Sequence, residues 1–474
     1  MTPETAQQNT AKKPNIVFIF ADEWRAQATG YAGDPNCHTP HLDRFAQESI
    51  NFTNAASGCS VCCPYRGSLL SGQYPQKHGI FINDVELPKD TYSIARAFND
   101  NGYQTGYIGK WHVYGSPGGA YERRTSYVPR EFQMGFDYWK AFECSHDYND
   151  SHYFFNDDPT RRQWEGYDAF AQSHDAAAYI KDHADEEAPF LLMLSLGPPH
   201  FPLHTAPEKY RQRYADKELI LRENVPEEKR PLAQEELRGY YAHIEACDDA
   251  FKVVYDAIDE AGLREDTIFI FTADHGDMRQ SQGLNTKLFP WDESVCVPFL
   301  MRWPQLSDMP PTENPLPIDA PDIMPTLLGL CNFETPESVQ GRDWAPIIRG
   351  EEVLTGEEAT FLNMTAEFTE LCFTGMKAYR GLRTNRYTYV RNTDGPWLLY
   401  DNLEDPYQMN NLINQNHAED IQNKLELQLQ ERLTELGDEF LDSRVYIERA
   451  GHTHFKEVFM ECREQWHDPW KKSD

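Results

Sequence analysis

The chain has 474 residues, 40% of them hydrophobic, which is enough for one large folded domain with a smaller one beside it. It carries 76 acidic and 44 basic residues, a formal net charge of −32, which argues against nucleic acid or an anionic membrane surface as a partner. No apolar run approaches the length of a membrane span, and the ten cysteines show neither a zinc spacing nor a disulfide framework.

The N-terminal segment divides into a polar stretch and a strand. Residues 1–13 lack the apolar core of a signal peptide, and we expect a disordered tail or the remnant of a removed leader there. Residues 15–20 form a continuous apolar run that predicts a buried parallel strand, with Asp22 and Glu23 at its carboxyl end. Ligand sites of open α/β sheets lie at that end of the strands.

Residues 60–72 predict a short helix with reactive side chains in its first turn. Pro64 favours the start of the helix and Leu69 and Leu70 bury its inner face, so Cys62 lies near the positive end of the helix dipole. Arg66 follows one turn later and offers a planar fork that suits a tetrahedral oxyanion such as sulfate or phosphate. A buried structural cysteine is the commoner role of a lone thiol, and these residues alone leave that alternative open.

Three later apolar runs resemble the first strand and also end in polar residues. They are residues 105–108 before Lys110 and His112, 190–196 before His200, and 267–272 before Asp274 and His275. Between the last two, apolar residues at three-and-four spacing over 237–258 predict a helix packed on the sheet. Strands that alternate with helices predict a doubly wound, mostly parallel sheet.

From about residue 373 the pattern changes to polar–apolar alternation. Residues 387–390 and 397–400 predict antiparallel strands, and Asp394-Gly395 between them predicts a hairpin turn. A helix marked by Ile421, Leu425, Leu429 and Leu433 follows. We therefore predict a large α/β domain over residues 14–372, and a smaller subdomain of antiparallel sheet and helix, with a tail, over residues 373–474.

Cys62, Pro64 and Arg66 match the CxPxR signature of the type I sulfatases, and residues 69–79 extend the match, so the chain resembles this family of the alkaline phosphatase superfamily. The resemblance implies a large mixed sheet sandwiched by helices. It also implies that a formylglycine-generating maturation enzyme oxidises Cys62 to an aldehyde, whose hydrate is the nucleophile. The neighbouring Cys59 and Cys63 lack Pro at plus two together with Arg at plus four. Export to a bacterial periplasm or beyond is a further implication.

Asp22, Glu23, Asp274 and His275 are the candidate metal ligands. Oxygen ligands with one imidazole suit a hard divalent cation, and Ca²⁺ tolerates irregular geometry best. In the family the cation holds a sulfate oxygen and polarises the sulfur for attack. Glu23 and His275 stand where Asp and Asn are more usual, and His275 resembles the arrangement in phosphonate monoester hydrolases and some carbohydrate sulfatases. Mg²⁺, Mn²⁺ and Zn²⁺ therefore remain open.

Four further residues match the family in their local sequence. Lys110 and His112 stand in GKWH, His200 in PPHFP, and Lys287 in the segment that follows the metal pair. The resemblance implies that Lys110 steadies the formylglycine oxygens and that His112 acts as the base. It further implies that His200 contacts the leaving oxygen and that Lys287 binds the sulfate.

An aromatic and polar insertion over residues 144–164 suits the binding of sugar rings. Its candidate substrate residues are His146, Tyr148, His152, Arg161 and Arg162. Core packing is an equally open interpretation of these aromatic side chains. We therefore expect removal of sulfate from an oligosaccharide of a sulfated polysaccharide, such as the marine algal glycans ulvan or carrageenan. The alternatives are a phosphonate monoester or phosphodiester hydrolase and a non-catalytic glycan-binding relative.

Overall fold

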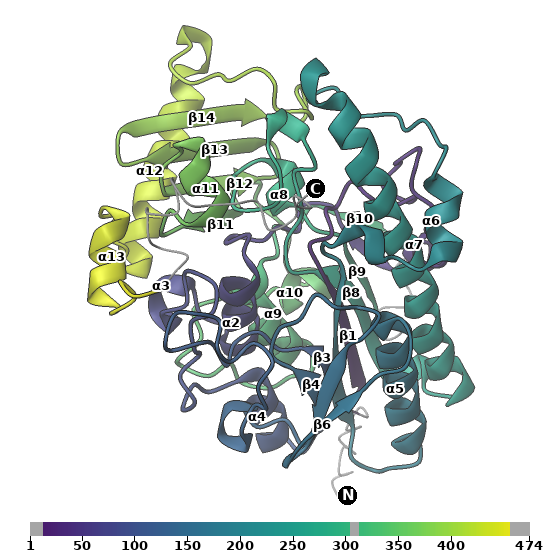
Figure 1. Cartoon of the computed structure of the whole chain (residues 1–474). Helices are drawn as coiled ribbons and strands as arrows, with labels where there is room; N and C mark the ends of the chain where they lie inside the picture. Colours follow the sequence, from purple (N-terminus) through teal and green to yellow (C-terminus); the bar gives the residue numbers. More distant parts are fainter. Residues whose placement is uncertain (1–12, 304–311, 456–474) are drawn as a thin grey trace, which may run out of the picture.

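A computed structural model describes residues 13–303 and 312–455 and contains two sheets with helices around them (Figure 1). The tail expected at residues 1–13 lies outside this range except for its last residue, as do residues 456–474 of the expected C-terminal tail. The large sheet has ten strands in the order β10-β2-β9-β8-β1-β7-β3-β4-β5-β6. Their bounds, in that order, are Thr312–Asn314, Ile50–Phe52, Phe299–Arg302, Thr267–Ala273, Asn15–Asp22, Phe190–Pro199, Gln104–Lys110, Tyr138–Phe142, His152–Phe155 and Asp158–Gln163.

The centre of the large sheet confirms the four strands expected from the apolar runs. β8, β1, β7, β3 and β4 are parallel neighbours, whereas β9, β5 and β6 pair in antiparallel fashion, so the sheet is mixed as expected. Every residue of β1 is buried, because central parallel strands are covered on both faces. Phe20 of β1 is level with Ser195 of β7 and Thr272 of β8, so the three strands end together.

Helices cover both faces of this sheet, as Figure 1 shows. α7 packs on β7 together with α5, and α1 and α6 pack on α7; their bounds are Arg230–Glu260, Asp168–Asp182, Pro40–Ala46 and Glu208–Tyr214 in that order. The other face carries α2, α3, α4, α9 and α10, with bounds Cys62–Ser71, Pro75–His78, Ile94–Asp100, Ala320–Leu330 and Ala345–Ile348. α7 includes the helix predicted over 237–258 and buries its apolar side. No helix in the described part of the chain is long and apolar enough to cross a membrane.

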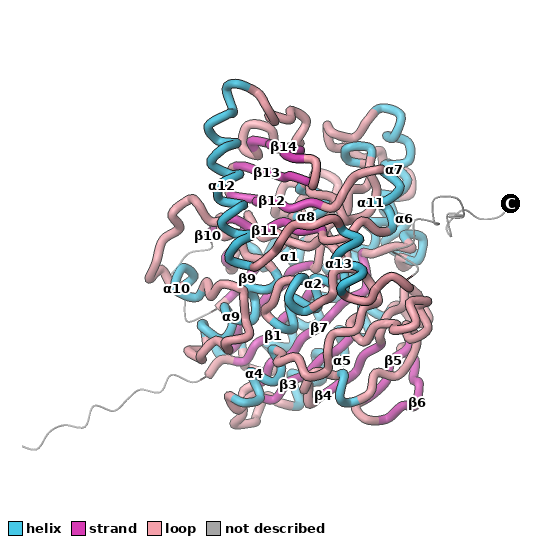
Figure 2. The backbone as a smooth tube through the Cα atoms, turned by 90° about the vertical axis from the view of Figure 1, so that its left-hand side faces the viewer, coloured by secondary structure: helices cyan, strands magenta, loops and turns pink. Residues whose placement is uncertain are grey.

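The small sheet is antiparallel, with strands in the order β11-β12-β13-β14, and α12 lies alongside it (Figure 2). The bounds of β11 to β14 are Ala359–Met364, Tyr379–Thr384, Tyr387–Asn392 and Gly395–Asp401; those of α11, α12 and α13 are Thr369–Thr374, Glu419–Leu436 and Ser443–Arg449. The predicted hairpin at Gly395 and the predicted helix are confirmed. The sheet starts before residue 373, with β11. The sequence pattern did not reveal this strand, because β11 is almost wholly buried and lacks the polar alternation used to predict the other strands.

A buried charge pair joins the small sheet to the rest of the molecule. Arg383 of β12 donates to both carboxylate oxygens of Asp292, at 2.9 and 2.8 Å, and Asp292 is the first residue of α8 (Asp292–Val295). Both residues are buried, and a guanidinium out of water requires such a bidentate partner. The small sheet is therefore fixed next to the segment that contains Lys287.

Candidate active site

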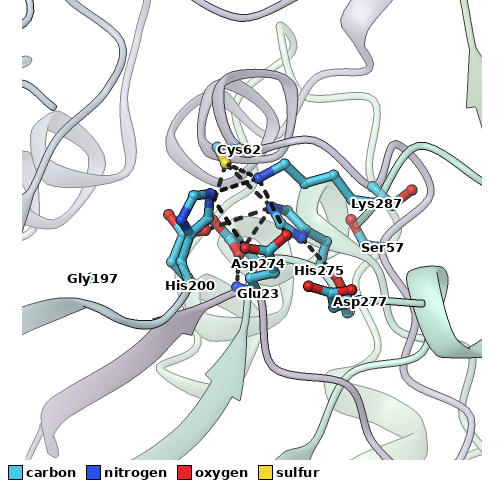
Figure 3. A network of polar contacts seen from close by, with 12 residues as sticks. Glu23, Ser57, Cys62, Gly197, His200, Asp274, His275, Asp277 and Lys287 are labelled. Atoms are coloured by element: carbon cyan, nitrogen blue, oxygen red, sulfur yellow. Dashed lines mark hydrogen bonds and ion pairs between the residues drawn. The ribbon is translucent and has the colours of Figure 1, made fainter. Parts of the chain in front are cut away.

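Cys62 is the first residue of α2, and its side chain is 1% exposed. Figure 3 shows Lys287, His200 and His275 converging on its sulfur. The Sγ atom lies 3.2 Å from His275 Nε2, 3.5 Å from Asp22 Oδ1 and 3.4 Å from Lys287 Nζ. The start of α2 therefore places the sulfur next to the tips of β1 and β8, where the sequence predicted the polar residues to gather.

A compact group of possible metal ligands surrounds this sulfur. Asp22, Cys62, Asp274 and His275 each offer a ligand atom, and these atoms lie within 4.8 Å of one another. His275 Nδ1 is 2.9 Å from the Gly276 carbonyl oxygen, which can only accept a hydrogen bond, so Nδ1 is the donor and Nε2, which faces Cys62, is the nitrogen that could bind a metal. Two carboxylates and one such imidazole form a donor set that fits a divalent cation.

Glu23, the fourth predicted ligand, lies outside that compact group. Its backbone has φ of 67°, and its amide donates to Asp274 Oδ1 at 3.0 Å. Both carboxylate oxygens are buried without a hydrogen bond; the Lys287 ammonium lies 3.6 Å and His200 Nε2 lies 3.3 Å from them. Burial raises the pKa of Glu23 well above its usual value, although Lys287 opposes this.

Arg66 and Lys110 donate hydrogen bonds to the aspartates of the site. Arg66 donates through Nη2 to Asp22 and Asp274, both at 3.2 Å, and through Nη1 to the Lys110 carbonyl and Ser195 Oγ. Lys110 Nζ donates to Asp22 Oδ2 at 2.6 Å. Burial opposes ionisation of Asp22, but Lys110 and Arg66 outweigh it and hold the pKa of Asp22 well below its usual value. The fork of Arg66, which the sequence assigned to an oxyanion, is thus occupied by protein acceptors, because a fully buried guanidinium requires them.

Lys287 and His200 form a second hydrogen-bonded pair at the sulfur. His200 Nδ1 lies 2.9 Å from the Phe201 carbonyl and must donate to it, so His200 Nε2 accepts from Lys287 Nζ at 2.9 Å. Burial, and next the charge of Lys287, lower the pKa of His200 well below its usual value. The ring of His146 stacks on His200 with centroids 4.3 Å apart and planes 9° from parallel.

His112 is 3% exposed and has φ of 59°, and neither of its ring nitrogens has a hydrogen bond. Its pKa is lowered well below the usual value by burial and then by Lys110. The carboxylate of Asp84 lies 4.0 Å from His112 Nε2 and accepts a hydrogen bond from Arg124 Nε at 2.9 Å. The sequence prediction missed Asp84, because it lies in a loop with no periodic pattern, and missed Ser195, because it lies inside an apolar run.

The structure places two of the predicted substrate residues among core side chains. Tyr148 is fully buried, and its hydroxyl lies 3.1 Å from the Phe201 carbonyl, while His152 is 2% exposed and its ring packs against Phe142 and Phe154. These side chains fill the core, the alternative that aromatic content had left open. Arg161 and Arg162 are exposed on β6, the edge strand, and Arg162 pairs with Asp158 at 2.7 Å. Of the five candidates, only His146 stacks on the His200 ring.

Comparisons with known proteins agree with this geometry. The profile of the family described as Sulfatase matches residues 14–333, and that described as N-sulphoglucosamine sulphohydrolase, C-terminal, matches residues 281–435. An ulvan-active sulfatase of Formosa agariphila is 43% identical over 455 residues, covering 95% of this chain and 87% of that protein. An endo-4-O-sulfatase of Bacteroides thetaiotaomicron is 31% identical, covering 93% and 95%. The structure of a putative sulfatase from Bacteroides fragilis superposes with a TM-score of 0.82 at 29% identity, covering 94% of this chain and all of that one.

Proposed function

The chain belongs to the sulfatase family and is a sulfuric ester hydrolase, and we propose that it removes sulfate from oligosaccharides of a sulfated polysaccharide with residue 62, oxidised to formylglycine, as nucleophile. The observation that carries the proposal is the position of Cys62 Sγ, 3.5 Å from Asp22, 3.2 Å from His275 and 3.4 Å from Lys287. In the mature protein the formylglycine oxygens would project from this position. A sulfate ester bound there would meet a nucleophile, possible metal ligands and a cation together.

A divalent cation fits the residues at the strand tips, and we propose Ca²⁺. Asp22, Asp274 and Nε2 of His275 would hold it, and the buried oxygens of Glu23, which have no hydrogen bond, are proposed as a further ligand. The bound cation would supply Lewis-acid polarisation of the sulfate ester. Asp22 stays ionised for this role, because Lys110 and Arg66 lower its pKa.

The charges of these residues show why a cation matters for binding an anion. Three basic side chains (Arg66, Lys110, Lys287) face three acidic ones (Asp22, Glu23, Asp274), so the formal charges of these side chains sum to zero. A divalent cation adds two positive charges in a buried site, where electrostatic interactions are strong. The pocket would then attract the sulfate group even though the chain has a net charge of −32.

We assign proton transfer to the remaining residues. Lys287 Nζ and His200 Nε2 share a hydrogen bond of 2.9 Å, so the pair can hold one proton and give it to the departing alcohol oxygen. His112 has two ring nitrogens without partners and a lowered pKa, so it is neutral and able to accept a proton from a hydroxyl at residue 62. Burial of all three side chains keeps bulk water from competing with the nucleophile.

For the substrate we propose a sulfated algal glycan of the ulvan type. Support comes from the relative in Formosa agariphila, which is ulvan-active and 43% identical over 95% of this chain. Export to the periplasm or beyond is part of the same proposal, since a polysaccharide is met outside the cytoplasm. His275 keeps a phosphonate monoester or phosphodiester hydrolase as the second candidate, because it resembles the arrangement in that branch.

The test begins with mass spectrometry of the Cys62 peptide, which establishes how much formylglycine is present. Rates are then measured on sulfated ulvan oligosaccharides, an aryl sulfate, a phosphonate monoester and a phosphodiester. We expect the highest kcat/KM on a sulfated oligosaccharide, and a phosphodiester preference by orders of magnitude would reject the first proposal. Cys62→Ala should be inactive, whereas the matched Cys63→Ala, which changes a buried neighbour, should keep formylglycine and activity.

A further inference from the structure

The backbone on both sides of Lys287 is unusual. Thr286 has φ of 62° and Leu288 has φ of 83°, although neither is glycine. Side chains with a Cβ rarely adopt this left-handed region, and a bulky leucine or a β-branched threonine keeps it only where surrounding contacts over-determine it. The position of Lys287 therefore depends on whatever anchors these two neighbours.

Within the segment, the Thr286 amide donates to Asn285 Oδ1 at 3.0 Å, and three hydrogen bonds from outside the segment supply the other anchors. The Thr286 carbonyl accepts from the Met278 amide at 2.7 Å, and the Leu288 amide donates to the Ser60 carbonyl at 3.3 Å. The third comes from the small sheet: the hydroxyl of Tyr379, the first residue of β12, donates to the Leu288 carbonyl at 3.1 Å. Tyr379 is 1% exposed, so solvent cannot replace this bond without rearrangement.

The same contacts connect Lys287 to the nucleophile. Ser60, which accepts from Leu288, lies two residues before Cys62. Its hydroxyl also accepts from Ser294 Oγ at 3.0 Å, and Ser294 Oγ in turn accepts from the Phe289 amide at 3.3 Å. The turn before Cys62 and the segment after Lys287 are thus bound to each other, and Tyr379 joins them from the other sheet.

We propose that Tyr379 is a positioning residue for Lys287: its hydroxyl fixes the Leu288 carbonyl and so holds the lysine ammonium against residue 62 and His200. The inference rests on the proposed function, because it takes Lys287 as a group that acts on the reacting ester. It assigns to the C-terminal sheet a role in catalysis that acts through another residue. In the described part of the chain, the Tyr379 hydroxyl donates to the Leu288 carbonyl and not to Cys62, Lys287 or His200.

The test replaces the hydroxyl alone, in Tyr379→Phe. The matched control is Tyr389→Phe on the adjacent strand β13, where a tyrosine that is also fully buried donates to Glu426, away from Lys287. Loss of one such hydrogen bond changes a rate or equilibrium constant by up to about tenfold. We therefore expect kcat and kcat/KM of Tyr379→Phe to fall together by about fivefold to tenfold, with KM unchanged. Each variant loses one buried hydrogen bond, so Tyr379→Phe and Tyr389→Phe should lower the melting temperature by similar amounts. Tyr389→Phe should leave kcat unchanged.

A second pair of variants separates positioning from general structural damage. In a Lys287→Ala background, adding Tyr379→Phe should change the residual kcat by less than about twofold, because the group it positions is gone. An equal fall in both backgrounds, or a wild-type rate in Tyr379→Phe alone, would overturn the inference. All rates are divided by the formylglycine content at residue 62. A fully matured wild type that is inactive on every sulfate ester rejects the proposed function instead, which keeps the two failures distinguishable.

Discussion

Replacement of Lys110 by methionine tests the proposed active site directly. Lys110 is 0% exposed, and its ammonium donates to Asp22 Oδ2 at 2.6 Å. Methionine keeps an unbranched chain that can fill the space and removes the positive charge. The variant should lose activity, because one cation near the reacting ester is gone, and should lose stability, because Asp22 loses the shorter of its ion pairs with Lys110 and Arg66.

Both magnitudes follow from the geometry. Loss of one preorganised charge or donor at a reacting oxyanion typically lowers kcat by about 10²- to 10³-fold. Breaking a buried ion pair costs about 3–5 kcal/mol, and because Arg66 Nη2 still lies 3.2 Å from Asp22 we expect about 3 kcal/mol. An unfolding entropy of about 2.1 cal/mol/K per residue over 474 residues gives about 1 kcal/mol/K, so the melting temperature should fall by about 3 °C.

Lys140→Met is the matched control, since Lys140 also pairs with a carboxylate, Asp175 at 2.7 Å, but on β4 and with 16% of its side chain exposed. It should lower the melting temperature by about 1 °C or less and leave kcat unchanged, because partly exposed ion pairs contribute little. The assay is steady-state kinetics on one sulfated oligosaccharide together with thermal unfolding at fixed formylglycine content. A Lys110→Met enzyme with kcat within about threefold of wild type would refute the role assigned to this charge.

Three further predictions concern pH, the cation and salt. Burial lowers the pKa of His78 from 6.5 to about 3, so between these pH values only the unfolded chain binds the proton. The unfolding free energy should therefore fall by up to about 1.4 kcal/mol per pH unit on acidification. Urea titrations at several pH values should show that the unfolding free energy of His78→Asn depends less steeply on pH than that of the wild type. An equal slope in both proteins would contradict this. Removal of the cation with EGTA should abolish the thermal protection given by inorganic sulfate, and Ca²⁺ should restore it; protection that persists in EGTA would show that the basic residues suffice. Raising NaCl from about 0.01 to 0.1 M shortens the Debye length from about 30 to 10 Å, so kcat/KM on an anionic oligosaccharide should rise with kcat unchanged, and a fall in kcat/KM would contradict a dominant long-range repulsion.

The arrangement of strands was predictable from the sequence for a physical reason. Continuous apolar runs such as residues 15–20 can be satisfied only by burial on both faces, which a central parallel strand provides. The carboxyl ends of parallel strands lie at one edge of the sheet, so the acids at the ends of β1 and β8 are expected to lie close together. In the structure, Asp22 and Asp274 both accept hydrogen bonds from the Arg66 guanidinium. A chain motif therefore led correctly to a spatial cluster.

The directions of the side chains at that edge were not predictable. Positive φ occurs at Glu23, His112, Thr286 and Leu288. None of them is glycine, so the residue types do not indicate this backbone conformation. Such conformations are imposed by tertiary contacts like the Tyr379 hydroxyl on Leu288, which join positions 91 residues apart. For the same reason the sequence indicated that Tyr148 binds sugar rings, although the Tyr148 ring is buried in the core.

The net charge of −32 and an anionic substrate are compatible because the two sets of charges act at different ranges. The ion pairs of the site, such as Lys110 with Asp22 at 2.6 Å and Arg66 with Asp274 at 3.2 Å, are buried, so they interact strongly and with little screening by salt. Acidic side chains at the surface act through solvent, where salt screens them within about 10 Å at 0.1 M. Surface charge thus sets how often an anionic oligosaccharide reaches the pocket, whereas the buried residues and their cation decide how tightly the sulfate is held and how fast it reacts. This separation is why salt should change kcat/KM alone, and why removal of Lys110 should change kcat.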